Sequence, residues 1–244
     1  MCEHSSNGLH RRSLFKRAAA ASALAATSLA GIGVPSLAYA AAMTREQRDK
    51  MSPDDIIESF KEGNRRFRDG KMMQHDYRAQ KRATATGQFP AAVILSCIDS
   101  RTPAEILLDV GIGETFNARI ARNIQNDDIL GSMEFACAVV GAKVVLVMGH
   151  TACGAIRGAI DGAELGNLTG LLDKIKPAIP RTKYDGDRSG SNYDFVDAVA
   201  RTNVEMTMEQ IRSNSPVLKK LEDDGEIKIA GSMYHLVGGE VEFY

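Results

Sequence analysis

Two short, unbroken apolar segments constrain the fold of this chain more than any other feature. They are residues 91–96 (AAVILS) and residues 143–148 (KVVLVM). Both have the length of a β-strand, and neither alternates between polar and apolar side chains, which is typical of strands in a parallel sheet covered on both faces. Helical patterns lie between and after these segments, and strands that alternate with helices predict an α/β fold. We therefore expect a mainly parallel central sheet flanked by helices.

The predicted helices carry recognisable start and stop signals. Ser52 and Pro53 form a cap and first turn within the first helical segment, and Gly70 is its stop signal. A Thr-Pro-Ala-Glu sequence from Thr102 is typical of a capping box, and Gly141 ends a later helix. The predicted helices cover residues 44–80, 102–108, 129–140, a stretch from Gly154 onward and about 194–213, and further strands are predicted at residues 227–230 and 241–243.

The composition predicts one globular domain with a small-molecule partner. The chain has 244 residues, of which 44% are hydrophobic and 25% charged, close to the averages for globular proteins. The formal net charge is −1 and no basic stripe is present, so we expect no nucleic-acid partner. Four cysteines are too few and too scattered for a disulfide scaffold, so metal binding or burial must account for them. Cys137, inside a helical segment, is predicted to be a buried core residue.

Residues 1–40 have the order of an export signal. An arginine pair at positions 11–12 precedes a mildly apolar segment, residues 18–37, and an Ala-Tyr-Ala sequence follows at 38–40. This order predicts a signal peptide of the twin-arginine type, and therefore a periplasmic or secreted bacterial protein whose mature domain is residues 41–244. An uncleaved membrane anchor is the alternative, but two glycines and a proline interrupt the segment, so we expect no stable membrane anchoring.

Three potential metal ligands follow the two predicted strands. Cys97 comes directly after the first strand, and His150 and Cys153 come directly after the second. The carboxyl ends of neighbouring parallel strands share one crevice, and residues three positions apart can lie on one side of the turn into a helix. Two thiolates and one imidazole suit a tetrahedral zinc ion with a fourth position open for water. Taken singly, each residue is more often structural, but their joint occurrence at two strand ends favours a metal site.

Asp99 and Arg101 follow Cys97 at two-residue steps. The Asp99 carboxylate has two candidate places: it coordinates the metal and closes the site, or it pairs with the Arg101 guanidinium and accepts a hydrogen bond from a metal-bound water. An Asp/Arg pair is most often an ordinary surface salt bridge, but the position beside a predicted metal ligand favours a role at the site.

Two of these segments resemble the signature motifs of a known family. Residues 97–101 (CIDSR) and residues 150–155 (HTACGA) are similar to the Cys-x-Asp-Ser-Arg and His-x-x-Cys-Gly motifs of β-class carbonic anhydrases. The similarity extends from about Ser52 to the C-terminus. The resemblance implies reversible hydration of carbon dioxide to bicarbonate and a proton, with a zinc hydroxide as the nucleophile.

The resemblance also implies roles for the residues discussed above. One Zn²⁺ per subunit would be held by Cys97, His150 and Cys153. Asp99 and Arg101 would form the catalytic dyad, with Asp99 a zinc ligand only in a closed state.

Three further residues match substrate-binding positions of the family. Gln88 stands where plant-type members place an amide that helps to bind bicarbonate, Phe116 matches an aromatic wall residue, and Phe135 stands where some members have tyrosine. The resemblance further implies a homodimer or higher homo-oligomer in which Gln88 and Phe116 face the zinc of the neighbouring subunit. Residues 122–126 (RNIQN) depart from the family pattern, which has small residues between the asparagines.

The sequence leaves three alternative functions open. The same zinc hydroxide could act on a related linear substrate, carbon disulfide or carbonyl sulfide. The protein could instead be a non-catalytic zinc-binding protein whose site is closed permanently by Asp99. Cys97 and Cys153 could also form a redox pair. His75 and His235 are candidates for passing a proton to buffer, but no spacing supports this role, and both are expected on the surface.

Overall fold

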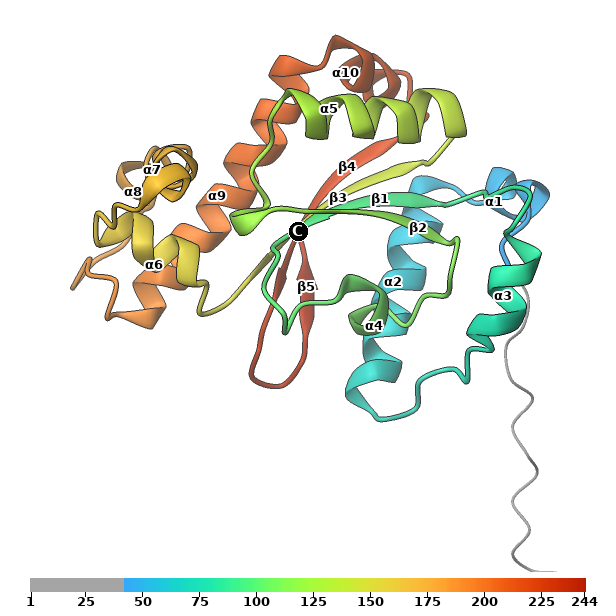
Figure 1. Ribbon diagram of the computed structural model, residues 1–244, viewed down its shortest axis with the longest axis horizontal. Helices are drawn as coiled ribbons and strands as arrows, with labels where there is room; N and C mark the ends of the chain where they lie inside the picture. The colour runs from blue at the N-terminus through green and yellow to red at the C-terminus, as the bar shows by residue number, and fades with distance from the viewer. Residues whose placement is uncertain (1–41) are drawn as a thin grey trace, which may run out of the picture. The chain divides into compact units, whose positions relative to one another are not determined.

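The computed structural model describes residues 42–244, which contain one five-stranded sheet, and the predicted signal peptide lies outside the described residues. The strands are β1 (Ala92–Ser96), β2 (Thr115–Arg119), β3 (Val144–His150), β4 (Lys228–Tyr234) and β5 (Val241–Phe243). Their order is β2-β1-β3-β4-β5 (Figure 1). Three pairings are parallel, and only β5 runs antiparallel to its neighbour β4. The predicted α/β fold with a mainly parallel sheet is therefore confirmed.

Helices cover both faces of this sheet. They are α1 (Arg45–Lys50), α2 (Pro53–Arg68), α3 (Tyr77–Ala83), α4 (Ala104–Leu107), the 3-10 turn η1 (Ala121–Asn123), α5 (Asp127–Glu134), the π-helical turn η2 (Phe135–Val140), α6 (Gly154–Ile160), α7 (Gly166–Asp173), α8 (Ala178–Arg181), α9 (Tyr193–Asn214) and α10 (Pro216–Asp223). None of the helices within residues 42–244 has the length and apolar composition needed to cross a membrane.

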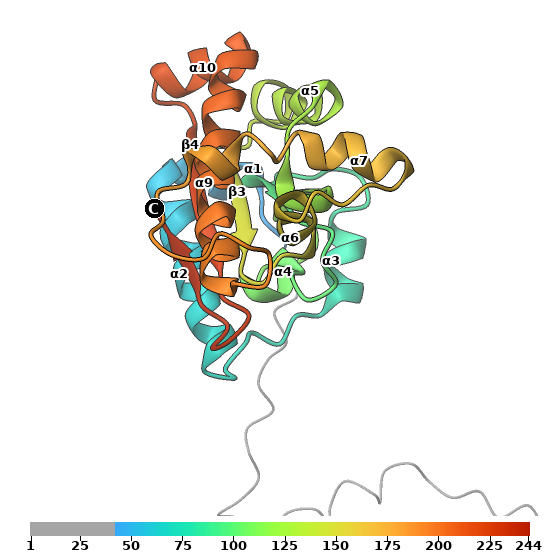
Figure 2. The same cartoon turned by 90° about the vertical axis from the view of Figure 1, so that its left-hand side faces the viewer.

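Alternate residues of β1 pack into opposite layers, as the unbroken apolar run predicts. Val93 and Leu95 pack in one core cluster with residues of α5, α9 and α10. Ala92 and Ile94 pack in a second cluster, with residues of α2 and α4. Figures 1 and 2 show α9 running along the sheet beside β3 and β4, which it contacts. Because β1 and β3 are parallel neighbours, the loops that follow them lie together at the carboxyl edge of the sheet.

The helical segment predicted at residues 44–80 is divided into three helices. Met51 ends α1 with an extended backbone, φ −78° and ψ 135°. Ser52 then begins α2 as predicted, because its hydroxyl accepts the Asp55 N–H and the Asp55 carboxylate accepts the Ser52 N–H. Gly70, with φ 66°, follows the end of α2. One long periodic pattern in the sequence therefore covers several helices separated by extended residues.

The prediction of a capping box at Thr102 is wrong, and the sequence patterns did not predict the strand β2. The Thr102 hydroxyl donates to the Asp99 carbonyl oxygen at 3.0 Å, and α4 begins at Ala104, with Pro103 at the N-cap position and no side-chain cap. Thr102 therefore fixes the loop that carries Asp99 instead of starting the helix. The strand β2 contains no apolar run because its residues are half-buried or exposed.

The helix predicted at residues 129–140 begins at Asp127 and changes to a π-helical turn for its last six residues, η2. Gly141 ends it with φ 94°, and Cys137 on η2 is buried, both as predicted. The long helix predicted near the C-terminus is α9, and the two strands predicted after it are β4 and β5.

The close approach of α2 to the segment after α4 depends on Gly63. A Cβ at this position would lie 1.8 Å from the Leu108 carbonyl oxygen. The neighbouring Asn64 donates from Nδ2 to the carbonyl oxygens of Leu107, at 3.1 Å, and Gly239, at 2.9 Å. These contacts tie α2 to α4 and to the turn between β4 and β5.

Gly63→Ala is expected to lower the free energy of unfolding by about 2 kcal/mol or more, because the atom that its Cβ meets is backbone and cannot rotate away. Chemical denaturation of the purified protein measures the change. Gly170→Ala on α7 is the matched control: no atom lies within 4 Å of its added Cβ, so we expect no loss of stability or a gain of up to about 1 kcal/mol. Equal stability of the two variants would contradict the close approach.

Candidate metal centre

The three predicted ligands meet at one edge of the sheet. Because β1 and β3 are parallel neighbours, Cys97, directly after β1, and His150, the last residue of β3, leave the sheet side by side. Cys153 follows in the turn before α6. The candidate ligand atoms of the three residues all lie within 4.8 Å of one another, and all three residues are buried.

This arrangement fits a tetrahedral zinc ion. Zn–S distances of about 2.3 Å and Zn–N distances of about 2.0–2.1 Å place ligand atoms roughly 3.5–3.8 Å apart, so small side-chain movements are sufficient. Among residues 42–244, Nε2 of His150 is buried with no hydrogen-bond partner, while its Nδ1 lies 2.8 Å from the Thr151 carbonyl oxygen. Nδ1 therefore carries the donated hydrogen, which leaves the Nε2 lone pair available for a metal.

Contacts from α9 and β4 hold the turn between His150 and Cys153. Ala152 has a left-handed backbone, φ 52°, and its N–H donates to Oδ1 of Asp197 on α9 at 2.7 Å. The Thr151 N–H donates to the carbonyl oxygen of Tyr234 on β4 at 3.0 Å. The spacing of the two ligands is therefore fixed by the core and not by the turn alone.

The pKa values of the Cys97 and Cys153 thiols are linked through a hydrogen bond between the two side chains. A hydrogen bond from the Cys97 thiol, aided by His150 and by the positive charge of Arg122, holds the pKa of Cys153 far below its usual value of 9.0. The same hydrogen bond, together with burial, raises the pKa of Cys97. These shifts favour one negative charge on the cysteine pair before a metal binds, and a zinc ion would replace the remaining proton.

The Asp99 carboxylate pairs with Arg101, which is the second of its two predicted places. Arg101 Nε lies 2.9 Å from Oδ1 and Nη2 lies 2.8 Å from Oδ2, and the Arg101 backbone N–H also donates to Oδ1 at 3.0 Å. The hydrogen bond from the Arg101 side chain is the main cause that holds the pKa of Asp99 well below its usual value. Oδ2 of Asp99 lies 3.9 Å from His150 Nε2, so this ion pair stands beside the ligand cluster.

Arg119 supports the same loop, and the sequence patterns did not single it out. Its Nε donates to the Cys97 carbonyl oxygen at 2.9 Å, and its Nη2 donates to the Asp99 carbonyl oxygen at 2.6 Å. It is the last residue of β2, which lies beside the end of β1 in the sheet. To place Arg119 beside the loop that carries Asp99 from sequence alone, β2 would have had to be recognised as an edge strand.

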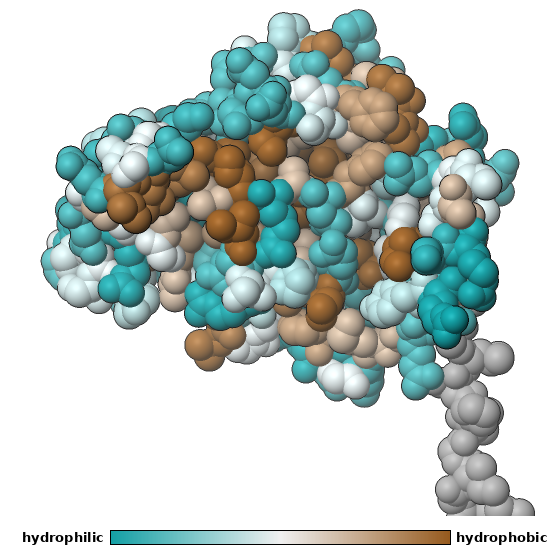
Figure 3. All heavy atoms as spheres, viewed as in Figure 1, coloured by the Kyte–Doolittle hydropathy of each residue, from teal (hydrophilic) through white to brown (hydrophobic). Residues whose placement is uncertain are grey.

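The predicted substrate residues lie away from the ligand cluster of their own chain. Phe116 on β2 pairs with Val93, four residues before Cys97, so it lies about 13 Å farther back along the strands. Phe116 and Phe135 have ring centroids 6.3 Å apart and line a cavity of about 730 Å³. Figure 3 shows apolar surface over α5 and beside it on this face of the molecule. Gln88 is exposed in the loop before β1.

The expected surface placement of His75 is wrong. Its side chain is 2% exposed, and its Nε2 lies 3.0 Å from Oδ1 of the buried Asp109. His235 is partly exposed and lies 3.3 Å from Oε2 of Glu242. Neither histidine belongs to the ligand cluster, and His75 joins α3 to the segment after α4 through Gln80 and Asp109.

Comparison with known proteins identifies the family. Residues 92–241 match the family model described as carbonic anhydrase. The carbonic anhydrase of Mycolicibacterium smegmatis is 32% identical over 78% of this chain and 93% of that protein. Carbonic anhydrase 2 of Mycobacterium tuberculosis is 31% identical over 77% of this chain and 91% of that protein. A crystal structure of a tetrameric β-carbonic anhydrase from Sordaria macrospora matches with a TM-score of 0.59 and 25% identity, over 65% of this chain and 82% of that one. The chain therefore belongs to the β-class carbonic anhydrase family.

Proposed function

We propose that this protein is a zinc carbonic anhydrase that interconverts carbon dioxide and bicarbonate. The observation that carries the proposal is the convergence of Cys97, Cys153 and His150 beside a fixed carboxylate, where His150 Nε2 has no hydrogen-bond partner among the described residues. Two sulfur ligands and one nitrogen are a donor set suited to zinc with an open fourth position. When bound there, zinc would lower the pKa of a water ligand to about 7 and supply the nucleophile.

Asp99 is the residue that accepts a hydrogen bond from the reacting oxygen. Arg101 keeps the carboxylate charged and fixes its orientation through two side-chain hydrogen bonds. The carboxylate then orients a lone pair of the oxygen toward carbon dioxide. Ile124, buried in one cluster with Cys97 and Cys153, forms an apolar wall that excludes water on that side.

The ion pair also argues against the non-catalytic alternative. Closure of the site by Asp99 would require the carboxylate to give up its hydrogen bonds to Arg101. Arg119 and Thr102 both bind the Asp99 carbonyl oxygen and hold the loop in its present course. Asp99 therefore stands beside the open position without filling it.

The proposal includes a homodimer or higher homo-oligomer. Phe135 is about half exposed and Val139 on η2 is 73% exposed, beside the cavity that Phe116 lines. Apolar area of this kind is typical of a subunit contact. In the assembled protein, Gln88 and Phe116 would lie at the zinc of the neighbouring subunit and bind substrate there.

The proposal also includes export by the twin-arginine route to the periplasm or the medium. Its support is the order of the arginine pair at 11–12, the apolar segment and the Ala-Tyr-Ala sequence.

Cys153→Ala is expected to remove the stoichiometric zinc and the carbon dioxide hydration activity, because a two-ligand site binds zinc far more weakly than a three-ligand site. Metal analysis and stopped-flow hydration assays measure both. Cys137→Ala is the matched control, a buried cysteine outside the ligand cluster, and should keep zinc and activity. Full zinc content in Cys153→Ala would refute the ligand assignment.

Asp99→Asn is expected to lower kcat for hydration by about 100-fold or more with zinc retained, because a neutral amide loses the charged pairing with Arg101 and accepts the hydrogen bond from the reacting oxygen more weakly. Stopped-flow assays on the metal-quantified protein measure the loss. Carbon disulfide and carbonyl sulfide, assayed in parallel, are expected to react more slowly than carbon dioxide.

Glu209→Gln is the control for Asp99→Asn, since it removes the charge of a surface ion pair with Arg181. We expect its kcat to equal that of the unmodified protein. A similar kcat in both variants would exclude Asp99 from the reaction.

The double substitution Arg11→Lys and Arg12→Lys is expected to keep the precursor in the cytoplasm of a bacterial host, because the twin-arginine route reads the arginine pair. Cell fractionation and immunoblotting measure the distribution. Arg17→Lys, outside the pair, is the control and should be exported. Equal amounts of mature protein outside the cytoplasm from both variants would rule out this route.

A further inference from the structure

Arg122 is a fully buried cation without an acidic partner. Its residue exposure is 0%, and it is the largest of the fully buried side chains. Among residues 42–244, no carboxylate lies within salt-bridge distance of its guanidinium, and its Nε and Nη1 have no hydrogen-bond partner. Only Nη2 is satisfied, by the carbonyl oxygen of Ala200 on α9. An uncompensated buried charge is strongly unfavourable, so a negative charge close to this guanidinium would be stabilising.

The residue lies directly against the metal centre. Its backbone N–H donates to Cys97 Sγ at 3.3 Å. Its positive charge also acts on Cys153: after the hydrogen bond from Cys97 and the neighbouring His150, it is a further cause of the lowered pKa of that thiol. The backbone of Arg122 is therefore in direct contact with a sulfur atom that becomes anionic when a metal binds.

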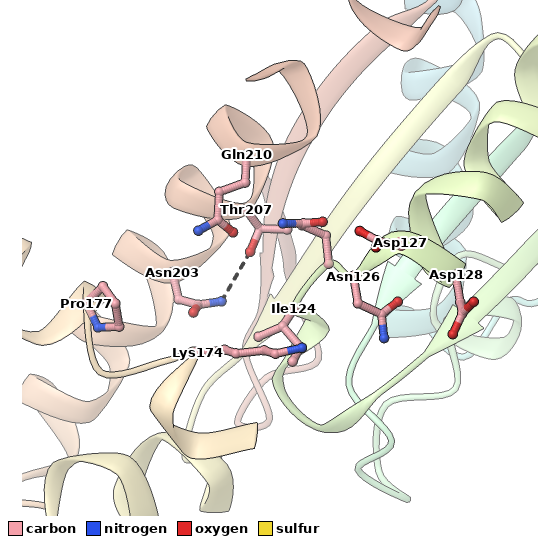
Figure 4. Close-up of a pocket in the computed structure, with 10 residues that line it drawn as sticks. Ile124, Asn126, Asp127, Asp128, Lys174, Pro177, Asn203, Thr207 and Gln210 are labelled. Carbon is pink, nitrogen blue, oxygen red and sulfur yellow. Dashed lines mark hydrogen bonds between the residues drawn. The ribbon is translucent and has the colours of Figure 1, made fainter. Parts of the chain in front are cut away.

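The fold forces this placement. Arg122 has a left-handed backbone, φ 70° and ψ 29°, which is unfavourable for any residue with a Cβ. Its carbonyl oxygen accepts a hydrogen bond from Asn203 Nδ2 at 3.4 Å, and Asn203 is itself bonded to Thr207. Figure 4 shows both of these α9 residues on the wall of a cavity of about 500 Å³, across from Ile124. The side chain is thereby directed into the core and away from solvent.

We infer that Arg122 is a positioning residue of the metal centre, whose buried guanidinium balances the negative charge of the two cysteine sulfurs. The inference rests on the proposed zinc site. Two thiolates bring as much negative charge as zinc brings positive charge, so an anion in the open position makes the centre negative. A fixed cation in surroundings of low dielectric constant stabilises that charge without reorganisation.

The test compares Arg122→Met with Arg122→Lys. Both side chains are long and fit the same path, but only lysine keeps the positive charge. Arg122→Met is expected to lower zinc affinity roughly 10- to 100-fold in competition with a chelator, and Arg122→Lys is expected to keep it within a few-fold. The thermal unfolding of the metal-free Met variant is expected at a temperature similar to that of the metal-free parent, because the lost attraction to the cysteine pair is offset by the removal of a buried guanidinium with a single hydrogen bond.

Arg48→Met is the matched control. Arg48 is also buried, but it binds Asp49 and the Val140 carbonyl oxygen, outside the ligand cluster. We expect this variant to lose stability and to keep its zinc affinity.

The outcomes separate this inference from the proposed function. Equal zinc affinity in Arg122→Met and the parent, with zinc lost in Cys153→Ala, would overturn the inference and leave the zinc site intact. A metal-free Arg122→Met protein that unfolds at a markedly lower temperature, with no rescue of zinc affinity by lysine, would show a merely structural role and would also overturn it. Failure of the parent protein to bind zinc would overturn the proposed function itself.

Discussion

The parallel pairing of β1 with β3 is the constraint on which the rest of the site depends. Because both strands end at the same edge of the sheet, Cys97 and His150 meet although they come from distant parts of the sequence. Both strands are buried on both faces, so the positions of their ends are set by the whole core. The ligands need no long loop to reach one another, and a metal site on such rigid elements keeps its geometry when the metal is absent.

Charge balance organises the residues around these strand ends. The positive charge of the buried Arg122 contributes to the lowered pKa of the buried Cys153 thiol, and the Asp99 carboxylate pairs with the Arg101 guanidinium. The first pair is fully enclosed, whereas Arg101 is exposed and Asp99 is only partly buried. On the inference made above, the enclosed pair would have the stronger influence on metal binding, because interactions between charges weaken in water. The outer pair is placed to act on a substrate that arrives from solvent.

Strand geometry explains which parts of the site were predictable from sequence. Buried parallel strands are continuous apolar runs, and their ends coincide in space, so Cys97 and His150 could be brought together without a structure. The edge strand β2 carries no such run, and its supporting arginine was missed with it. The sequence predicted that the Thr102 hydroxyl caps a helix, but in the structure this hydroxyl donates to the Asp99 carbonyl oxygen. The course of the loop, which the sequence pattern does not show, decides between these two roles. The burial of His75 depends on Asp109, a residue that no local pattern links to it.

Backbone strain in the described part of the chain is concentrated at the metal centre. Among residues 42–244, the non-glycine residues with positive φ are Asp109, Arg122, Asn123 and Ala152, and the last three belong to the two loops that carry or contact the ligands. Hydrogen bonds from α9 hold both loops, through Asp197 and Asn203. Strained residues persist only where their surroundings over-determine them. Metal binding would add to that restraint, since the free energy of binding to a preformed site is also free energy of folding. The same ion that supplies the chemistry would therefore stabilise the strained loops that hold it.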